Sequence, residues 1–128
     1  MPWSRSATSR ARGWTKSSVG RLTTHVLDTA NGKPGAAMAL ELFVLERAQW
    51  RSLKAAKTNA EGRTDAPLLE GAHFRAATYQ LVFDVGAYFK GGGFLDLVPI
   101  RFVIKDAAAH YHVPLLCSPW SYTTYRGS

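Results

Sequence analysis

The folded part of this chain alternates between apolar and polar side chains, and this period of two constrains the fold more than any other feature. Successive side chains of a β-strand point to opposite faces of a sheet, so a strand with one buried face shows such alternation. Near the start, Leu22 and Val26 fall on one face and His25 falls on the other. Residues 78–85 and 94–105 repeat the pattern. The pattern therefore predicts a protein built from β-strands.

Turn-forming residues separate these segments. The pair Asn31-Gly32 supplies the positive φ angles of a tight turn, and residues 59–63 form a second polar turn. Asp84 can cap a short helix through Phe89, and the glycines at 91–93 would stop it. Short strands at near-regular spacing, with turn signals between them and at most one short helix, are typical of an all-β domain.

The remaining segments complete the expected architecture. We expect further strands at 38–47, 50–58, 111–118 and 120–126, and a short extended piece at 64–69. A total of about eight strands suits two packed sheets. The sequence thus predicts an antiparallel two-sheet sandwich with one short helix. Its last strand would lie at a sheet edge, where an unprotected strand usually pairs with another chain.

The charge of the chain is concentrated at its beginning. The 128 residues carry a net charge of +7, and residues 1–20 contain four basic side chains and no acidic one, Arg5, Arg10, Arg12 and Lys16. We therefore expect a flexible basic extension over 1–20 and one folded domain over 21–128. The domain alone has a net charge of +3 and no basic patch interleaved with aromatic residues. This composition argues against nucleic acid as a partner.

Cysteine usage and hydropathy bear on the compartment. A single cysteine, Cys117, cannot form an intrachain disulfide, which fits a reducing compartment such as the cytoplasm. No apolar run is long enough to cross a bilayer, so we expect no membrane partner. The extension lacks the apolar core of a signal peptide, and its Arg- and Ser-rich composition is also that of a transit peptide. Its role stays open between a targeting segment, a tail and a tag.

Two histidines near the end of the chain suggest a metal site. His110 and His112 are two residues apart and share a face of one strand, a spacing that can hold zinc. A zinc site needs a third ligand, and Cys117 falls on the opposite face. The zinc interpretation therefore stays an alternative without a complete ligand set.

Other single residues do not define a site by themselves. His25 projects away from the expected core, and Arg63 lies in a turn, so each is by default a surface residue. No Gly-x-Ser-x-Gly motif is present, and strand parity separates Cys117 from His112, which disfavours a Cys-His pair. No spaced pair of carboxylates suggests glycosidase chemistry.

Several separated motifs, taken together, resemble a known family. The motifs are Leu-Thr-Thr-His-Val-Leu-Asp-Thr-Ala-Asn-Gly-Lys-Pro at 22–34, Glu-Gly-Arg-Thr-Asp at 61–65, His-Tyr-His-Val-Pro-Leu-Leu at 110–116, Ser-Pro-Trp at 118–120 and Tyr-Arg-Gly-Ser at 125–128. In this order they resemble the transthyretin-like family, and within it the hydrolases of 5-hydroxyisourate. The resemblance extends from about Arg21 to Ser128.

The resemblance implies a fold, an assembly and an activity. It implies a two-sheet sandwich that assembles as a homotetramer, a dimer of dimers whose interface encloses a channel. It implies hydrolysis of 5-hydroxyisourate, the unstable product of urate oxidation, to 2-oxo-4-hydroxy-4-carboxy-5-ureidoimidazoline. The reaction would need no metal and no organic cofactor.

The resemblance also implies the site residues. The catalytic residues would be His25, Arg63, His112 and Ser128, and the substrate-binding residues would be Tyr125, Arg126 and Gly127. Transthyretin itself, the hormone carrier of the family, lacks the two histidines, the arginine and the Tyr-Arg-Gly-Ser ending. Departures from the family pattern at Gly35 and Cys117 lie outside these motif residues. The alternatives are a non-enzymatic carrier of small ligands and a zinc-dependent cyclic amidohydrolase.

Overall fold

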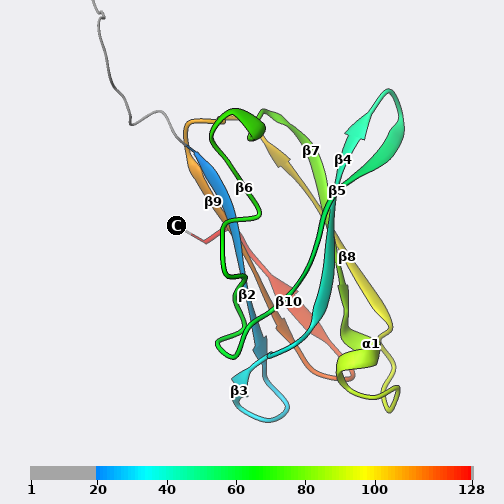
Figure 1. The fold of residues 1–128 in the computed structure, drawn as a ribbon. Coiled ribbons are helices and arrows are strands. Elements are labelled where there is room, and N and C mark those ends of the chain that lie inside the picture. Colours follow the sequence, from blue (N-terminus) through cyan, green and yellow to red (C-terminus); the bar gives the residue numbers. More distant parts are fainter. Residues whose placement is uncertain (1–19, 128) are drawn as a thin grey trace, which may run out of the picture.

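Two β-sheets pack face to face, and one short helix lies at one end of the sandwich (Figure 1). The computed structural model describes residues 20–127, so our expectations for the extension up to residue 19 and for Ser128 lie outside the described residues. Gly20, which we had assigned to the extension, is buried close to Phe74 and Ala107. The predicted all-β sandwich is confirmed.

The first sheet carries the histidines. Its strands follow the order β10 (Tyr122–Thr124), β9 (His110–Cys117), β2 (Arg21–Asp28) and β3 (Lys33–Pro34), and β6 (Leu69–Glu70) also pairs with β2. The last strand, β10, lies at an edge as predicted. Strands β2 and β9 run parallel, whereas the other pairings of this sheet are antiparallel. Alternation within a segment cannot reveal this direction, because parallel partners are joined by a long crossover.

The second sheet is antiparallel throughout. Its strands follow the order β5 (Gln49–Lys57), β4 (Ala39–Glu46), β7 (Ala77–Asp84) and β8 (Leu97–Ile104). Strand β4 is an inner strand with β5 as its hairpin partner, as we predicted. A short 3-10 helix, η1 (Gly71–His73), precedes β7. The extended piece that we expected at 64–69 is mostly loop, because only its last residue joins β6.

The core fills the space between the two sheets. Alternate residues of the inner strands are fully buried, among them Leu22, Val26, Leu42, Leu81, Phe83, Leu115 and Cys117. Burial of one such aliphatic or aromatic side chain stabilises a fold by about 1.5–3 kcal/mol relative to its exposure. Since one face of each strand is committed to the core, the other face is free to carry functional side chains.

Helix α1 (Val85–Tyr88) begins where the sequence predicted. The Asp84 side chain accepts a hydrogen bond from the backbone N–H of Ala87 at 3.1 Å, which caps the helix. The Tyr88 hydroxyl donates to Asp28 Oδ2 at 2.8 Å and so ties the helix to the end of β2. Asn31 also donates to the Asp28 carboxylate, through its backbone and side-chain nitrogens. None of the helices within residues 20–127 is long and apolar enough to cross a bilayer.

Candidate active site

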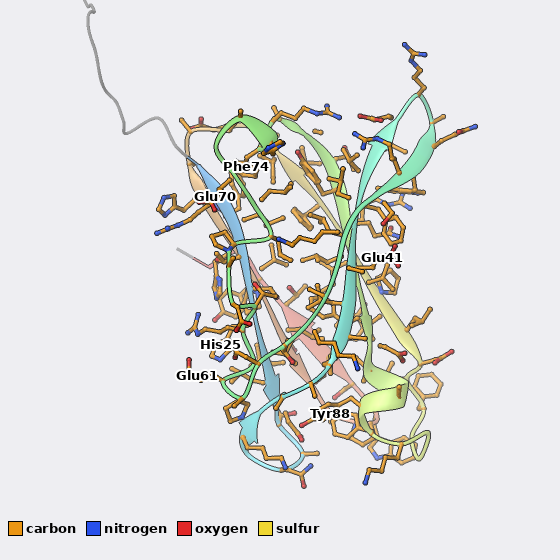
Figure 2. All side chains as sticks on the ribbon, in the orientation of Figure 1. His25, Glu41, Glu61, Glu70, Phe74 and Tyr88 are labelled. Atoms are coloured by element: carbon orange, nitrogen blue, oxygen red, sulfur yellow. The ribbon has the colours of Figure 1, made fainter. Side chains whose placement is uncertain are left out.

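The two predicted catalytic histidines stand on the same outer face of the first sheet, the face turned away from the second sheet. Parallel pairing of β2 with β9 places His112 opposite Thr23, two residues before His25. The neighbouring residues Thr24 and Val26 face the core, so His25 projects outward, as Figure 2 shows. The predicted orientation of His25 is therefore confirmed.

The loop after β5 folds over this face and is organised by Asn59. Its side-chain oxygen accepts hydrogen bonds from the backbone N–H groups of Glu61 at 2.9 Å and Arg63 at 3.1 Å. The Asn59 backbone N–H donates to the Arg63 carbonyl at 2.7 Å. These bonds hold the loop in one conformation and set the position of Arg63.

The same loop determines the tautomer of neutral His25. The Glu61 carbonyl oxygen lies 2.9 Å from His25 Nε2. Figure 2 labels both residues. A carbonyl oxygen only accepts hydrogen bonds, so Nε2 carries the proton in this contact. Neutral His25 therefore has its lone pair on Nδ1.

Gly62 allows the loop to approach β2 closely. Its φ angle is +78°, and a Cβ atom there would lie 2.3 Å from the Val26 carbonyl oxygen. The Val26 N–H donates to the Gly62 carbonyl at 2.7 Å, and His25 and Arg63 form an antiparallel bridge. Glycine is required here, because any side chain would push Arg63 away from His25.

Arg63 and Thr23 border the same hollow on the outer face. This hollow has a volume of about 130 Å³, and Thr64, Asp65 and Pro67 also line it. The Arg63 side chain is exposed in the single chain. A planar guanidinium at this position can bind the carbonyl edge of a flat ring.

His112 is held on two sides and is kept neutral. Its Nδ1 lies 2.9 Å from the Thr23 hydroxyl, and the Gly127 backbone N–H donates to its carbonyl at 2.7 Å. Burial lowers the pKa of His112, and the positive charge of Arg63 and the electrostatic influence of His25 lower it further. His112 is therefore suited to accept a proton at neutral pH.

The residues after β10 continue the ladder with β9. Gly127 bridges to His112, in the register that pairs Tyr122 with Cys117. Alternation then places Tyr125 on the outer face with His112, and 57% of its surface is exposed. Arg126 falls on the other parity of this ladder.

The contacts of Arg126 lie away from the imidazoles. Its guanidinium donates to the His110 carbonyl at 3.0 Å and lies over the Tyr111 ring, 4.1 Å from the ring centroid. The structure therefore brings together His25, Arg63, His112 and Gly127, and it directs the Arg126 side chain to the start of β9. Ser128 lies outside the described residues, and the functional roles of all these residues stay predictions.

Three groups that contact a histidine or organise the loop of Arg63 were missed from the sequence. These are the Thr23 hydroxyl, the Asn59 side chain and the Glu61 carbonyl. Strand parity places Thr23 on the same face as His25, but it does not reveal the partner His112, which is 89 residues away. The turn at 59–63 was predicted, but its approach to His25 was not.

Within residues 20–127, no three His, Cys, Asp or Glu side chains cluster as a metal site would require. The two histidines of the zinc alternative thus have no third ligand in this part of the chain. The Cys117 thiol is buried on the core side, opposite to His112, as parity predicted. Burial, together with the charge of Asp28, raises the pKa of Cys117 to about 11, which keeps the thiol protonated at neutral pH.

The chain is similar over most of its length to proteins of known name and structure. The 5-hydroxyisourate hydrolase of Ralstonia nicotianae is 53% identical over 117 residues, which cover 86% of this chain and 100% of that relative. A solved structure of (S)-allantoin synthase superimposes with a TM-score of 0.81 at 42% identity, and the match covers 86% of this chain and 44% of that chain. The Klebsiella pneumoniae 5-hydroxyisourate hydrolase superimposes with a TM-score of 0.73 at 32% identity, over 85% of this chain and 99% of that chain.

A family model matches almost all of the folded part as well. It is described as the HIUase/Transthyretin family, and it covers residues 22–127. Apart from Arg21, the first residue of β2, this range contains both sheets and every described residue of the candidate site. The chain belongs to the HIUase/Transthyretin family.

Proposed function

We propose that this protein hydrolyses 5-hydroxyisourate to 2-oxo-4-hydroxy-4-carboxy-5-ureidoimidazoline in urate degradation. The name of the Ralstonia relative, which matches over its whole length, supports this activity. The observation that carries the proposal is the arrangement of His25, Arg63 and His112, which come from three separate segments and meet on one sheet face. A carrier of the transthyretin type, as the resemblance describes it, lacks these three side chains.

The site contains the groups that the reaction requires. Hydrolysis of a cyclic amide needs a base for the attacking water, a donor for the carbonyl oxygen and an acid for the leaving nitrogen. In our proposal a neutral imidazole of the His25 and His112 pair takes a proton from water as the water oxygen attacks the carbonyl carbon. The Arg63 guanidinium would stabilise the negative charge that grows on the carbonyl oxygen. The imidazolium would then return the proton to the ring nitrogen as its bond to carbon breaks.

The residues after β10 would complete the substrate pocket. Tyr125 shares the outer face with His112, and Gly127 packs against the imidazole. Ser128 would follow them at the same site. We propose that Arg126 binds substrate only if its guanidinium leaves Tyr111, since the two groups are in contact in the single chain.

We further propose that the site is completed by assembly into a homotetramer, a dimer of dimers. In one chain the outer face is open to water, because Arg63 and Tyr125 are both exposed. A second protomer over this face would exclude water and strengthen each polar contact. The edge strands β8 and β10 expose Val103 and Tyr122, which fits pairing with another chain. A fully active monomer in sedimentation experiments would contradict this assembly.

The test of function is a direct assay. Urate oxidase generates 5-hydroxyisourate from urate, and ultraviolet absorbance follows its disappearance with and without the protein. We expect the protein to accelerate the disappearance of 5-hydroxyisourate, and we expect a chelator not to abolish this effect. In our proposal the enzyme is cytoplasmic and uses no cofactor. Tight ligand binding without acceleration would favour the carrier, and loss of activity with the chelator would favour the zinc alternative.

Variants test the site in the same assay. We expect His25→Ala, Arg63→Ala and His112→Ala each to lower kcat/KM by at least about 100-fold while the protein stays folded. His73→Ala is the matched control, because His73 is an exposed residue of η1. Near-wild-type ring opening by folded Arg63→Ala or His112→Ala would refute the proposed site.

A further inference from the structure

We infer that Thr23 is a positioning residue for His112, and that its hydroxyl holds Nδ1 so that Nε2 is the nitrogen presented to water and substrate. This inference rests on the proposed function, since it concerns the same site. It adds a residue that the motif comparison did not assign.

The register of the sheet creates the contact. Thr23 and His112 are direct partners in the parallel β2 and β9 pair, and Thr23 Oγ1 lies 2.9 Å from His112 Nδ1. Both side chains are half-buried on the outer face. A threonine is stiff at χ1 because it is branched at Cβ, so its hydroxyl keeps this direction at little entropic cost.

The partner of Thr23 distinguishes it from the other threonines of the fold. Five other threonine hydroxyls donate to backbone carbonyls and so brace the main chain, those of Thr24, Thr29, Thr58, Thr64 and Thr124. The Thr23 hydroxyl instead contacts a side-chain nitrogen. Such a contact orients a functional group rather than a strand.

A second contact closes the opposite side of the ring. A Cβ atom on Gly127 would lie 2.7 Å from His112 Cδ2, so the Gly127 backbone packs directly against the imidazole. The ring is thus held at Nδ1 by a hydroxyl and near Cδ2 by a glycine. With Nδ1 occupied by Thr23, Nε2 is the nitrogen left for the reaction.

The two histidines are held by chemically different partners. The Glu61 carbonyl only accepts a hydrogen bond, so it holds neutral His25 in a single tautomer. The Thr23 hydroxyl oxygen can accept a hydrogen bond from His112 Nδ1–H, and neutral His112 then has its lone pair on Nε2. Nε2 can gain and lose a proton while Nδ1–H keeps its contact with Thr23, and in our inference His112 exchanges the proton with water.

Substitutions of Thr23 test the inference. Thr23→Val keeps the shape and removes the hydroxyl, and we expect kcat to fall roughly tenfold, the ratio that corresponds to one ordinary hydrogen bond. KM should change less than kcat, and the acid limb of the pH profile of kcat should shift. Thr23→Ser restores the hydroxyl and should recover activity to within about threefold of wild type. Thr78→Val, on β7 of the other sheet, is the matched control and should match wild type.

Nitrogen NMR gives a readout that does not depend on turnover. The ¹⁵N shifts of His112 should change in Thr23→Val, while those of His25 should not. If wild-type protein fails to accelerate ring opening, the proposed function fails first. If wild type is active and Thr23→Val keeps its kcat, pH profile and His112 shifts, the positioning role is wrong and the function stands. Thr23→Ala serves the same comparison if the valine variant does not fold.

Discussion

Gly127 donates its backbone N–H to the His112 carbonyl at 2.7 Å and packs so closely on the imidazole that a Cβ atom would lie 2.7 Å from Cδ2. The two residues are 15 positions apart, and only the turn between β9 and β10 brings them together. This contact makes the orientation of His112 sensitive to one methyl group.

We therefore predict that Gly127→Ala impairs catalysis more than stability. The added methyl group would displace the ring, and a displacement of about 1 Å can lower the rate by about 100-fold. Steady-state kinetics and thermal unfolding of the same variant measure the two effects. Gly92→Ala is the control, because the nearest atom to its added Cβ would be 3.6 Å away, an ordinary contact. Equal kinetics for the two variants would show that Gly127 does not set the position of His112.

Asn59 should matter for catalysis although it does not contact His25. Asn59→Ala removes the acceptor of two backbone N–H groups and loosens the loop that carries Arg63. We expect the free energy of unfolding to fall by about 1–2 kcal/mol and kcat/KM to fall about tenfold. Denaturant titration and the ring-opening assay measure these changes. Asn31→Ala removes a side-chain bond from a different turn, so it should lower stability and leave kcat/KM unchanged.

The pH dependence of activity should follow His112. Burial and the nearby charges hold its pKa below the ordinary value of 6.5, so neutral His112 persists below that pH. We expect kcat/KM to decline only below pH 6.5. The free energy of unfolding should also fall as the pH drops below 6.5, because the unfolded chain then binds a proton at His112 more readily than the folded chain.

An NMR titration of His112 separates the causes of its low pKa. Arg63→Gln removes one positive charge and should raise the pKa of His112, whereas the contribution of burial should remain. Arg101→Gln, on the second sheet, is the charge-matched control. A pKa of His112 that is unchanged in Arg63→Gln would contradict a direct influence of the guanidinium.

Tyr88→Phe should lower stability without affecting the site. Burial alone would raise the pKa of Asp28, but hydrogen bonds from Asn31 and Tyr88 outweigh it and lower the pKa. The ionised carboxylate thus stabilises the fold above the unfolded value of about 3.8, and this contribution is lost as the pH falls through the lower folded pKa. We expect Tyr88→Phe to cost about 1–3 kcal/mol at pH 7 and less in acid.

Thermal unfolding across pH, with Tyr122→Phe as control, tests this expectation. Tyr122 is 43% exposed, so removal of its hydroxyl should change little. A loss of stability in Tyr88→Phe that is the same at every pH would contradict the role of the Asp28 carboxylate.

Much of the fold could be predicted because its rules are local. Side chains alternate along a strand, so the direction of His25 follows from Leu22 and Val26 without any coordinates. The cap at Asp84 and the turn at Asn31-Gly32 depend on bonds within a few residues, and both were found, although of that pair only Gly32 has a positive φ angle. The site residues other than Thr23, Asn59 and Glu61 followed from family motifs rather than from spacing.

The arrangement of the site depended on contacts that no local window contains. Which strand lies beside β2, in which direction and in which register, is decided by how all the buried faces fit into one core. That fit places Thr23 against His112, sends the Glu61 carbonyl to His25 and turns Arg126 toward Tyr111. The sequence by itself determined the strands and the faces of their side chains, because alternation is a property of the backbone. Only the tertiary structure decided which of these faces and loops meet, because that depends on packing between residues far apart in the chain.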